Sequence, residues 1–293
     1  MRVDAHQHFW ALARGDYGWL TPALEPIHRD FGPADLAPLL RRHRIDATIL
    51  VQAAPTAAET AFLLGIAAAT PFVAGVVGWV DLGAADAQAK IARRAADPLL
   101  VGIRPMVQDI VDDNWLLWDD LIPSFAGLAR HGLVFDALVR PRHLPRLARV
   151  VARHPDLTVV IDHMAKPPIA QWGAQWGAQR GAQGVLAPWD ADIAALARHP
   201  NVVCKLSGLA TEAARDWSVD DLRPYFEHVL ACFGPGRVLW GSDWPVVDLA
   251  GGYDSWWQAT EALLAGLSQD GQEAVLGGNA RRIYLGKRGR RPC

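Results

Sequence analysis

The chain has 293 residues, of which 51% are hydrophobic and 20% are charged, so it is long and apolar enough to bury a large core. Its 29 Lys and Arg residues nearly balance 31 Asp and Glu residues, and the resulting net charge of -2 offers no field that would attract nucleic acid or an anionic membrane. We therefore expect a globular protein with a small-molecule partner, and the sequence gives no indication of its oligomeric state.

The cysteines and the apolar runs bear on compartment and domain organisation. Cys204, Cys232 and Cys293 are too few and too far apart for a disulfide framework or a zinc cluster, which favours a reducing compartment. No apolar run approaches the roughly 20 residues of a membrane helix, and the chain begins with polar residues where a signal peptide would be apolar. We expect one cytoplasmic domain over residues 1–293, ending in a basic tail at 285–293.

Short β-branched or apolar runs alternate with stretches of helical period along nearly the whole chain. The predicted strands are Val3–His6, Ala47–Gln52, Val73–Val80, Leu100–Arg104, Val134–Val139, Thr158–His163, Val202–Lys205 and Val238–Ser242. The predicted helices are Asp35–Arg44, Thr56–Ala69, Ala85–Ala95, Trp115–His131, Arg142–His154, Asp190–His199 and Asp220–Phe233. Strands and helices that alternate eight times predict an α/β fold of the (β/α)8 TIM-barrel type. An open doubly wound sheet is the alternative, but no Gly-x-Gly-x-x-Gly turn follows the first strand.

Ionisable side chains gather at the predicted carboxyl ends of the strands, where a barrel places its chemistry. His6 and His8 leave the first strand one residue apart, so the period of two points both side chains to the same side. The later strands contribute Arg104, Asp136, Asp162, His163, Lys205 and Asp243. Charges buried at one end of apolar strands need a shared reason, and we interpret them as a functional site. A ring of ion pairs that closes the barrel mouth is the structural alternative.

Two convergent imidazoles are suited to a divalent metal such as zinc, or to a developing oxyanion that needs fixed N–H donors. A pair of hydrogen-bonded surface histidines is the plainer interpretation of His6 and His8 alone. Trp10 and Trp244 adjoin the candidate catalytic elements, and we predict that their rings contact substrate. For most of the other tryptophans, packing is the better interpretation.

Two segments stand apart from the strand and helix pattern. Residues 171–183 form a near-tandem Trp/Arg-Gly-Ala-Gln repeat in the loop after the sixth predicted strand. This repeat is either a neutral insertion, which we favour, or a lid that brings Trp172 and Trp176 over the site. The cationic residues after 286 are interpreted as a solvated tail.

Five motifs carry a family resemblance. They are His6-Gln-His-Phe-Trp10, Ile161-Asp-His163 with Lys166-Pro167, Lys205-Leu-Ser-Gly208, Gly241-Ser-Asp-Trp-Pro245 and Asn279-Ala280. In this order, from residue 1 to about 284, the chain resembles the amidohydrolase superfamily. More narrowly, it is similar to the branch that contains L-fuconolactone hydrolase, 2-pyrone-4,6-dicarboxylate hydrolase and 4-sulfomuconolactone hydrolase.

The resemblance implies a barrel that hydrolyses a carboxylic ester closed in a ring, with an aspartate from the last strand as the base. On that pattern Asp243 is the base, and His6, His8 and His163 are its catalytic neighbours. Two-metal members often place a lysine or carboxylate on strand four, where this chain has Arg104, so two metals are not expected. One metal held by His6, His8 and Asp243, with or without His163, is one alternative, and metal-independent catalysis is the other.

The substrate is expected to be an aldonolactone resembling L-fuconolactone. Arg104, with its fixed fork of donors, is the first candidate for substrate orientation. Lys205 is a second candidate, or it pairs with Asp136. The alternatives are a pyrone or muconolactone hydrolase of aromatic catabolism, a zinc-dependent decarboxylase of the same superfamily, and a non-catalytic barrel that binds a sugar acid.

Overall fold

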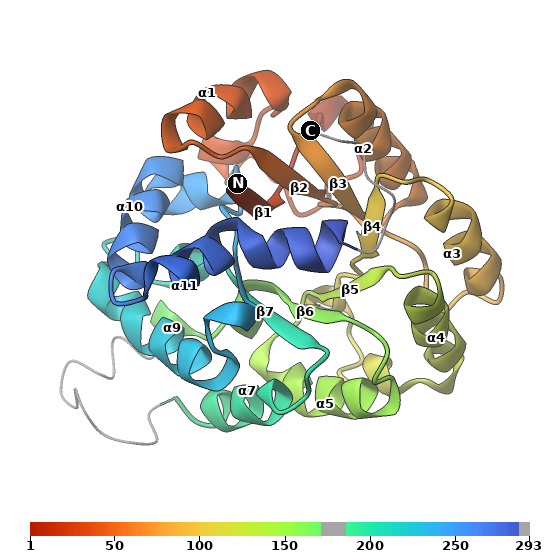
Figure 1. The fold of residues 1–293 in the computed structure, drawn as a ribbon. Helices are drawn as coiled ribbons and strands as arrows, with labels where there is room; N and C mark the ends of the chain where they lie inside the picture. Colours follow the sequence, from red (N-terminus) through yellow and green to blue (C-terminus); the bar gives the residue numbers. More distant parts are fainter. Residues whose placement is uncertain (171–185, 287–293) are drawn as a thin grey trace.

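The computed structural model describes residues 1–170 and 186–286. Within them, eight parallel strands pair in chain order, β1 with β2 through to β7 with β8. Their bounds are β1 Val3–Gln7, β2 Ala47–Val51, β3 Val73–Gly78, β4 Leu100–Ile103, β5 Val134–Ala137, β6 Val159–Ile161, β7 Val202–Leu206 and β8 Val238–Trp240. Parallel pairing in sequence order confirms the (β/α)8 barrel (Figure 1).

The first strand and the segment that follows the last strand lie side by side at the candidate site. The backbone N–H of His8 donates to the carbonyl of Trp244 at 2.7 Å, and that of Asp243 donates to the carbonyl of His6 at 2.8 Å. Gly241 permits this approach, because a Cβ atom there would lie 2.6 Å from the Cβ of His6. The glycine of the Gly-Ser-Asp-Trp-Pro motif therefore lets the two ends of the sheet meet.

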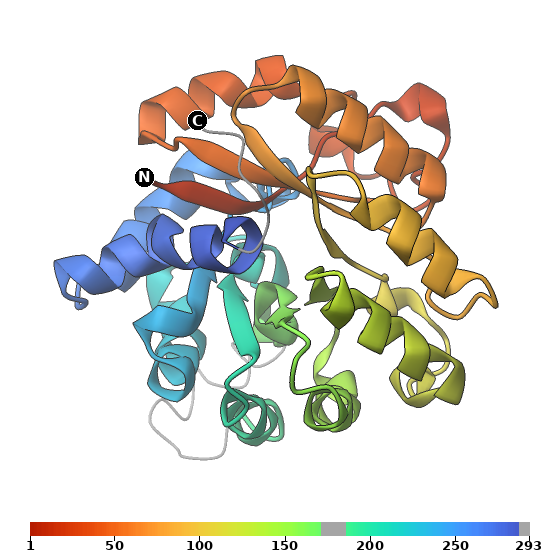
Figure 2. The same ribbon diagram turned by 45° about the vertical axis from the view of Figure 1, so that its right-hand side comes forward.

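Helices cover the outside of the barrel, as the two ribbon views show (Figures 1 and 2). The helices of the described residues are α1 Pro33–His43, α2 Ala57–Ala69, α3 Ala87–Ala95, α4 Ile122–Arg130, α5 Leu144–Arg153, α7 Trp189–Ala197, α8 Leu209–Glu212, α9 Val219–Phe233, α10 Gly252–Leu264 and α11 Gln269–Glu273. Helix α5 illustrates how the spacing of apolar residues determines which side of a helix faces the barrel. It buries Leu144, Leu147, Val150 and Val151 and leaves its arginines toward solvent.

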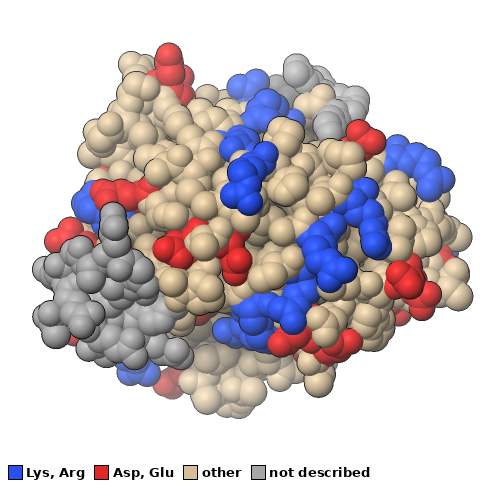
Figure 3. Space-filling model, turned by 90° about the horizontal axis from the view of Figure 1, so that it is seen from below, with Lys and Arg blue, Asp and Glu red and all other residues tan. Residues whose placement is uncertain are grey.

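Charged side chains of both signs lie on the face that α5 and α7 form (Figure 3). Arg142, which precedes α5, donates to Asp113 at 2.7 Å, and Arg146 donates to the side-chain oxygen of Asn114 at 3.1 Å. These contacts fix the loop after β4 against α5. None of the helices in the described ranges is long and apolar enough to cross a membrane.

The barrel interior has an apolar layer toward the amino ends of the strands. Inward residues from the strands pack there with Ala280, Ile283 and Tyr284 of the C-terminal segment. That segment contacts β1 and β8 through residues 274–278 and β3 and β4 through residues 281–285. The close approach requires Gly277, whose Cβ would lie 2.4 Å from the carbonyl oxygen of Met1. The C-terminal segment thus closes the amino end of the barrel.

The structure departs from one predicted helix. The predicted helix Trp115–His131 is instead two 3₁₀ turns, Trp115–Leu117 and Asp119–Leu121, followed by α4. Trp118 is extended between the turns, and Pro123 stands in the first turn of α4, where a missing N–H costs nothing. The repeat at 171–183 with its suggested lid lies outside the described residues, as does the tail from residue 287.

Candidate active site

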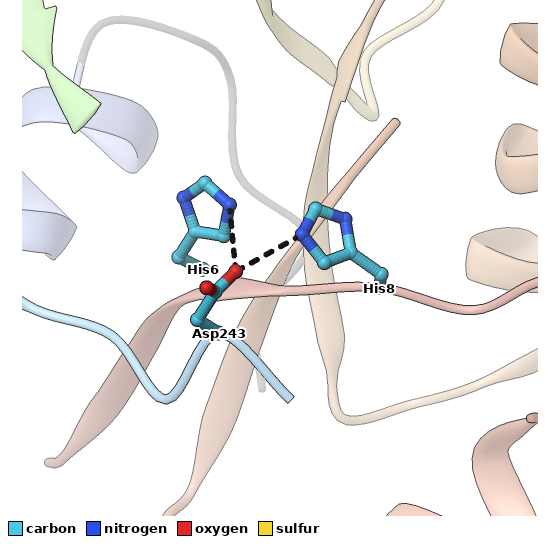
Figure 4. Close-up of side chains that lie close together, drawn as sticks. All are labelled: His6, His8 and Asp243. Atoms are coloured by element: carbon cyan, nitrogen blue, oxygen red, sulfur yellow. Dashed lines mark hydrogen bonds and ion pairs between the residues drawn. The ribbon is translucent and has the colours of Figure 1, made fainter. Parts of the chain in front are cut away.

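Three histidines surround one carboxylate oxygen at the carboxyl end of the barrel. Asp243 Oδ1 lies 3.3 Å from His8 Nε2, 3.6 Å from His6 Nε2 and 3.9 Å from His163 Nε2. Figure 4 shows that His6 and His8 leave β1 and both turn their rings toward Asp243. At most 4% of each of the four residues is exposed. The structure therefore brings together all four side chains predicted as catalytic.

The backbone at two of these residues is unusual. Asp243 and His163 have φ angles of 58° and 52°, and the left-handed conformation continues from His163 through Lys166. Non-glycine residues rarely adopt this conformation, and it costs about 1 kcal/mol or more at each position. His163 also packs against Gly208, where a Cβ would lie 2.5 Å from the ring Nδ1. The strain accompanies the turning of both side chains toward the same point.

Burial and mutual proximity set the charges of the cluster. Burial by itself would raise the pKa of Asp243, but the neighbouring imidazoles outweigh it and hold that pKa well below its ordinary value. Burial lowers the pKa of His163 to about 4 and lowers the pKa values of His6 and His8 as well. At neutral pH the cluster is therefore one carboxylate among uncharged imidazoles.

The hydrogen bond behind His8 shows that a metal ion fits the site. His8 Nδ1 lies 2.7 Å from the carbonyl oxygen of Val51, so Nδ1 carries the proton and Nε2 presents a lone pair. That lone pair faces the carboxylate oxygen of Asp243 at 3.3 Å, and two acceptors at this distance are stabilised by a cation between them. His6, His8 and Asp243 offer ligand atoms within 4.8 Å of one another, a donor set that zinc accepts.

Arg104 reaches into the same space from the end of β4. Its Nη1 lies 3.3 Å from His6 Nε2 and 3.5 Å from Asp162 Oδ2, and its Nη2 donates to the carbonyl oxygen of Gln52. The Nε–H group is buried and has no hydrogen-bond partner among the described residues. An unused donor on this guanidinium suits a ligand oxygen.

Lys205 lies behind the histidines, on the barrel axis side of β7. Its Nζ is 2.5 Å from Asp136 Oδ2, 2.9 Å from Asp162 Oδ1 and 3.2 Å from His6 Nδ1. The side chain is fully buried. The ion pair with Asp136, which the sequence allowed as an alternative to substrate contact, is present. In the structure the ammonium contacts these protein groups.

The two carboxylates that contact Lys205 have pKa values shifted in opposite directions. Burial raises the pKa of Asp136 to about 6 even though Lys205 opposes the shift. Burial would raise the pKa of Asp162 too, but the charges of Lys205 and His6 hold it well below its ordinary value. Asp162 is thus the firmly ionised member of the pair.

The two tryptophans predicted to contact substrate are buried in aromatic packing. Trp10 is 1% exposed, donates its Nε1–H to the carbonyl of Arg29 at 2.7 Å and lies near-parallel to His8 with ring centroids 6.4 Å apart. Trp244 is 2% exposed and packs edge to face on Phe9 and Phe31. Both rings are held by these protein contacts, and substrate contact by either ring stays a prediction. They fix the segment around His8 and Asp243.

Sequence reasoning missed several residues that hold the site. Asp4 accepts from the backbone N–H of Ser242 at 2.8 Å and of His6 at 3.2 Å, and so joins the two ends of the sheet. Ser207 Oγ lies 2.9 Å from His163 Nδ1. Glu59 accepts from the backbone of Ala53 at 2.9 Å, and burial raises its pKa to about 7. Only the polar character of Asp4 within a buried strand was a usable signal.

The whole described barrel corresponds to one known family. The amidohydrolase family profile matches residues 3–285. This chain belongs to the amidohydrolase family. The family membership that the motifs implied is therefore confirmed over nearly the full sequence.

Two curated relatives share the name L-fucono-1,5-lactonase. The Burkholderia ambifaria protein is 47% identical over 97% of this chain and 95% of its own length. The Burkholderia multivorans protein is 38% identical over 97% of this chain and 96% of its own length. A crystal structure of an amidohydrolase from Burkholderia multivorans with bound zinc superposes with a TM-score of 0.87, at 37% identity over 97% of this chain and 99% of that one.

Proposed function

We propose that this amidohydrolase opens the ring ester of a sugar-acid lactone, with an aldonolactone resembling L-fuconolactone as its substrate. The observation that carries the proposal is the single carboxylate oxygen of Asp243 with three imidazoles within 3.9 Å. The L-fucono-1,5-lactonases that match almost the whole chain support the choice of a sugar lactone. The chain is proposed to work as one barrel domain.

Asp243 is the proposed general base. A carboxylate that is ionised at neutral pH takes a proton from water, and the water oxygen bonds to the lactone carbonyl carbon. When the tetrahedral intermediate collapses, the bond between this carbon and the ring oxygen breaks. Asp243 then returns the proton to the ring oxygen, which leaves as the hydroxyl group of the open acid.

The histidines stabilise the negative charge that develops on the carbonyl oxygen. In the metal-independent form of the proposal, imidazole N–H groups of His6 and His163 donate to that oxygen. His8 cannot do so while its Nδ1 proton is held by Val51, so it accepts a hydrogen bond or ligates a metal. A divalent metal such as zinc, when bound, would polarise the carbonyl as a Lewis acid, held by His6, His8 and Asp243 with His163 nearby.

Arg104 is the proposed substrate-orienting residue, because its Nη1 lies 3.3 Å from His6 Nε2 and its buried Nε–H has no hydrogen-bond partner among the described residues. Lys205, Trp10 and Trp244 support the catalytic residues from behind in this proposal, since each is buried and in contact with protein groups. A carboxylated pyrone or muconolactone is the second candidate substrate, and the guanidinium of Arg104 is the feature that favours it.

A substrate panel tests the proposal. Purified protein is assayed by proton release on sugar lactones and on pyrone and muconolactone rings, with and without a chelator. Fast opening of aldonolactones is expected, and preference for a pyrone or muconolactone would replace the substrate. Carbon dioxide release from an aromatic acid, or no turnover of any lactone, would contradict the proposed reaction. Activity that survives chelation selects the metal-independent form.

A further inference from the structure

A continuous line of buried polar contacts runs from the C-terminal segment to the active site. The Tyr284 hydroxyl lies 2.8 and 2.9 Å from the two carboxylate oxygens of Asp136. Asp136 pairs with Lys205 at 2.5 Å, and Lys205 reaches His6 Nδ1 at 3.2 Å. Each of these residues is at most 2% exposed. Tyr284 belongs to the segment that closes the opposite end of the barrel.

We propose that Tyr284, Asp136 and Lys205 are positioning residues that hold His6 with its Nε2–H group directed at Asp243 and the reacting carbonyl. The inference rests on the proposed function, since it concerns the role of His6 in lactone opening. It adds that the C-terminal segment, besides sealing the barrel, supports the catalytic cluster.

The count of donors and acceptors around Lys205 supports this assignment. An ammonium group can only donate, and Lys205 forms hydrogen bonds with Asp136 and with His6 Nδ1 while Asp162 Oδ1 lies 2.9 Å away as an ion-pair partner. If His6 Nδ1 accepts, the proton of the neutral ring is on Nε2, which faces Asp243 Oδ1 at 3.6 Å. If Nδ1 instead carried the proton toward Asp162 at 3.5 Å, one ammonium donor would lose its acceptor in a fully buried place.

Arg104 competes for the same ring from the other side. Its Nη1 is 3.3 Å from His6 Nε2, but it also has Asp162 Oδ2 at 3.5 Å as an acceptor. Lys205 has no such replacement for its third donor among the contacts described. These contacts therefore favour the tautomer in which Lys205 donates to His6 Nδ1 and the ring proton is on Nε2.

This arrangement has a consequence for metal binding. An imidazole nitrogen that carries a proton cannot ligate a metal, and the ammonium behind His6 adds an unfavourable charge near the ion. The contacts that run from Tyr284 through Asp136 and Lys205 to His6 are called the relay here. The relay therefore opposes metal ligation by His6, while His8 and Asp243 keep free lone pairs. Removing the relay should strengthen metal binding, because Asp162 would then accept the Nδ1 proton and free Nε2.

The first test is Tyr284→Phe, which removes one hydroxyl group and keeps the ring. On the lactone that the wild type opens, kcat should fall about tenfold with KM unchanged, the usual scale for groups that orient a site residue. Thr260→Val is the matched control, because Thr260 is buried and its hydroxyl accepts from Trp240 at 2.8 Å outside the relay. Melting temperature is measured for both. An unchanged kcat, or an equal loss in the control, would overturn the inference.

The second test is the double variant Asp136→Asn with Lys205→Met, which removes both charges of the ion pair together. Zinc affinity, measured by competition with a chelating dye, should rise about tenfold over the wild type, because a ligand nitrogen of His6 is freed from its proton. Equal or weaker zinc binding by a folded double variant would overturn the inference. The outcomes are separable from the proposed function, which fails only if the wild-type protein opens no lactone.

Discussion

The two halves of the barrel interior differ within single strands. Toward the amino ends, Val134, Val160 and Val203 pack in one apolar layer with the C-terminal segment. Two residues further along the chain from each valine lie Asp136 on β5, Asp162 just after β6 and Lys205 on β7, whose charged groups meet inside the barrel. An apolar layer that stabilises the fold and a charged layer that supports the site are thus only two residues apart along the chain. Substitutions in the two layers should have different consequences.

The largest effect on stability is expected for Lys205→Met. The change leaves Asp136 buried without its cation and Asp162 with only the Arg104 contact at 3.5 Å, and breaking a buried pair in this way costs about 3 to 5 kcal/mol. Urea unfolding followed by circular dichroism measures it. The double variant with Asp136→Asn should recover most of the loss. A single variant within about 1 kcal/mol of the wild type would mean that the charged layer is not held by this pair.

Arg104→Ala tests the charged layer from the substrate side. If the guanidinium binds the ground state and transition state equally, KM should rise roughly 10- to 100-fold while kcat changes little, the scale of a charged hydrogen bond. Steady-state kinetics on the preferred lactone measure the two constants. Arg149→Ala on the exposed side of α5 is the control. A fall in kcat at constant KM would instead place Arg104 among the groups that act in the transition state.

Glu59 is a buried carboxylate that has no ion pair with any of the described residues, in contrast to Asp162. Burial raises its pKa to about 7 from 4.5, so the folded protein retains a proton that the unfolded chain releases. Stability should therefore fall as pH rises from about 4.5 to about 7, with the full penalty above pH 7. As pH rises from 5 to 8, the free energy of unfolding of the Glu59→Gln variant should increase relative to that of the wild type by on the order of 2 kcal/mol. A difference independent of pH would contradict the shift.

The smallest effect is expected in the apolar layer. Val203→Ala should reduce the free energy of unfolding by about 1.5 kcal/mol through lost burial, with kcat and KM unchanged. Urea unfolding and lactone kinetics on the same preparation measure both. A tenfold loss of kcat here would show that the two layers are not separable.

The strand pattern of the sequence predicts the fold because each apolar run is bounded by polar residues and is followed by a helical stretch. The eight predicted strands all occur, with ends that differ by at most two residues. Predicting the barrel also placed His6, His8, His163 and Asp243 at one rim, where the structure brings them together. Period and topology suffice for this, since parallel strand ends must meet at one end of a barrel.

Other features depend on tertiary contacts that no local pattern encodes. Lys205 is enclosed by Asp136 on β5 and Asp162 just after β6, whose carboxylate oxygens lie 2.5 and 2.9 Å from its Nζ. Trp10 and Trp244 both pack edge to face with Phe31, which lies on a loop that is distant from Trp244 in the sequence. The predicted helix ranges also did not include α8, α10 and α11.

The central claim, that Asp243 is the base at the centre of three imidazoles, is tested most directly by Asp243→Asn. The substitution keeps the shape of the side chain and removes the carboxylate. On the lactone preferred by the wild type, kcat should fall by about 10³-fold, within the range for loss of a general base, while KM stays close to the wild-type value. A folded Asn variant that retains turnover within about tenfold of the wild type would contradict the account.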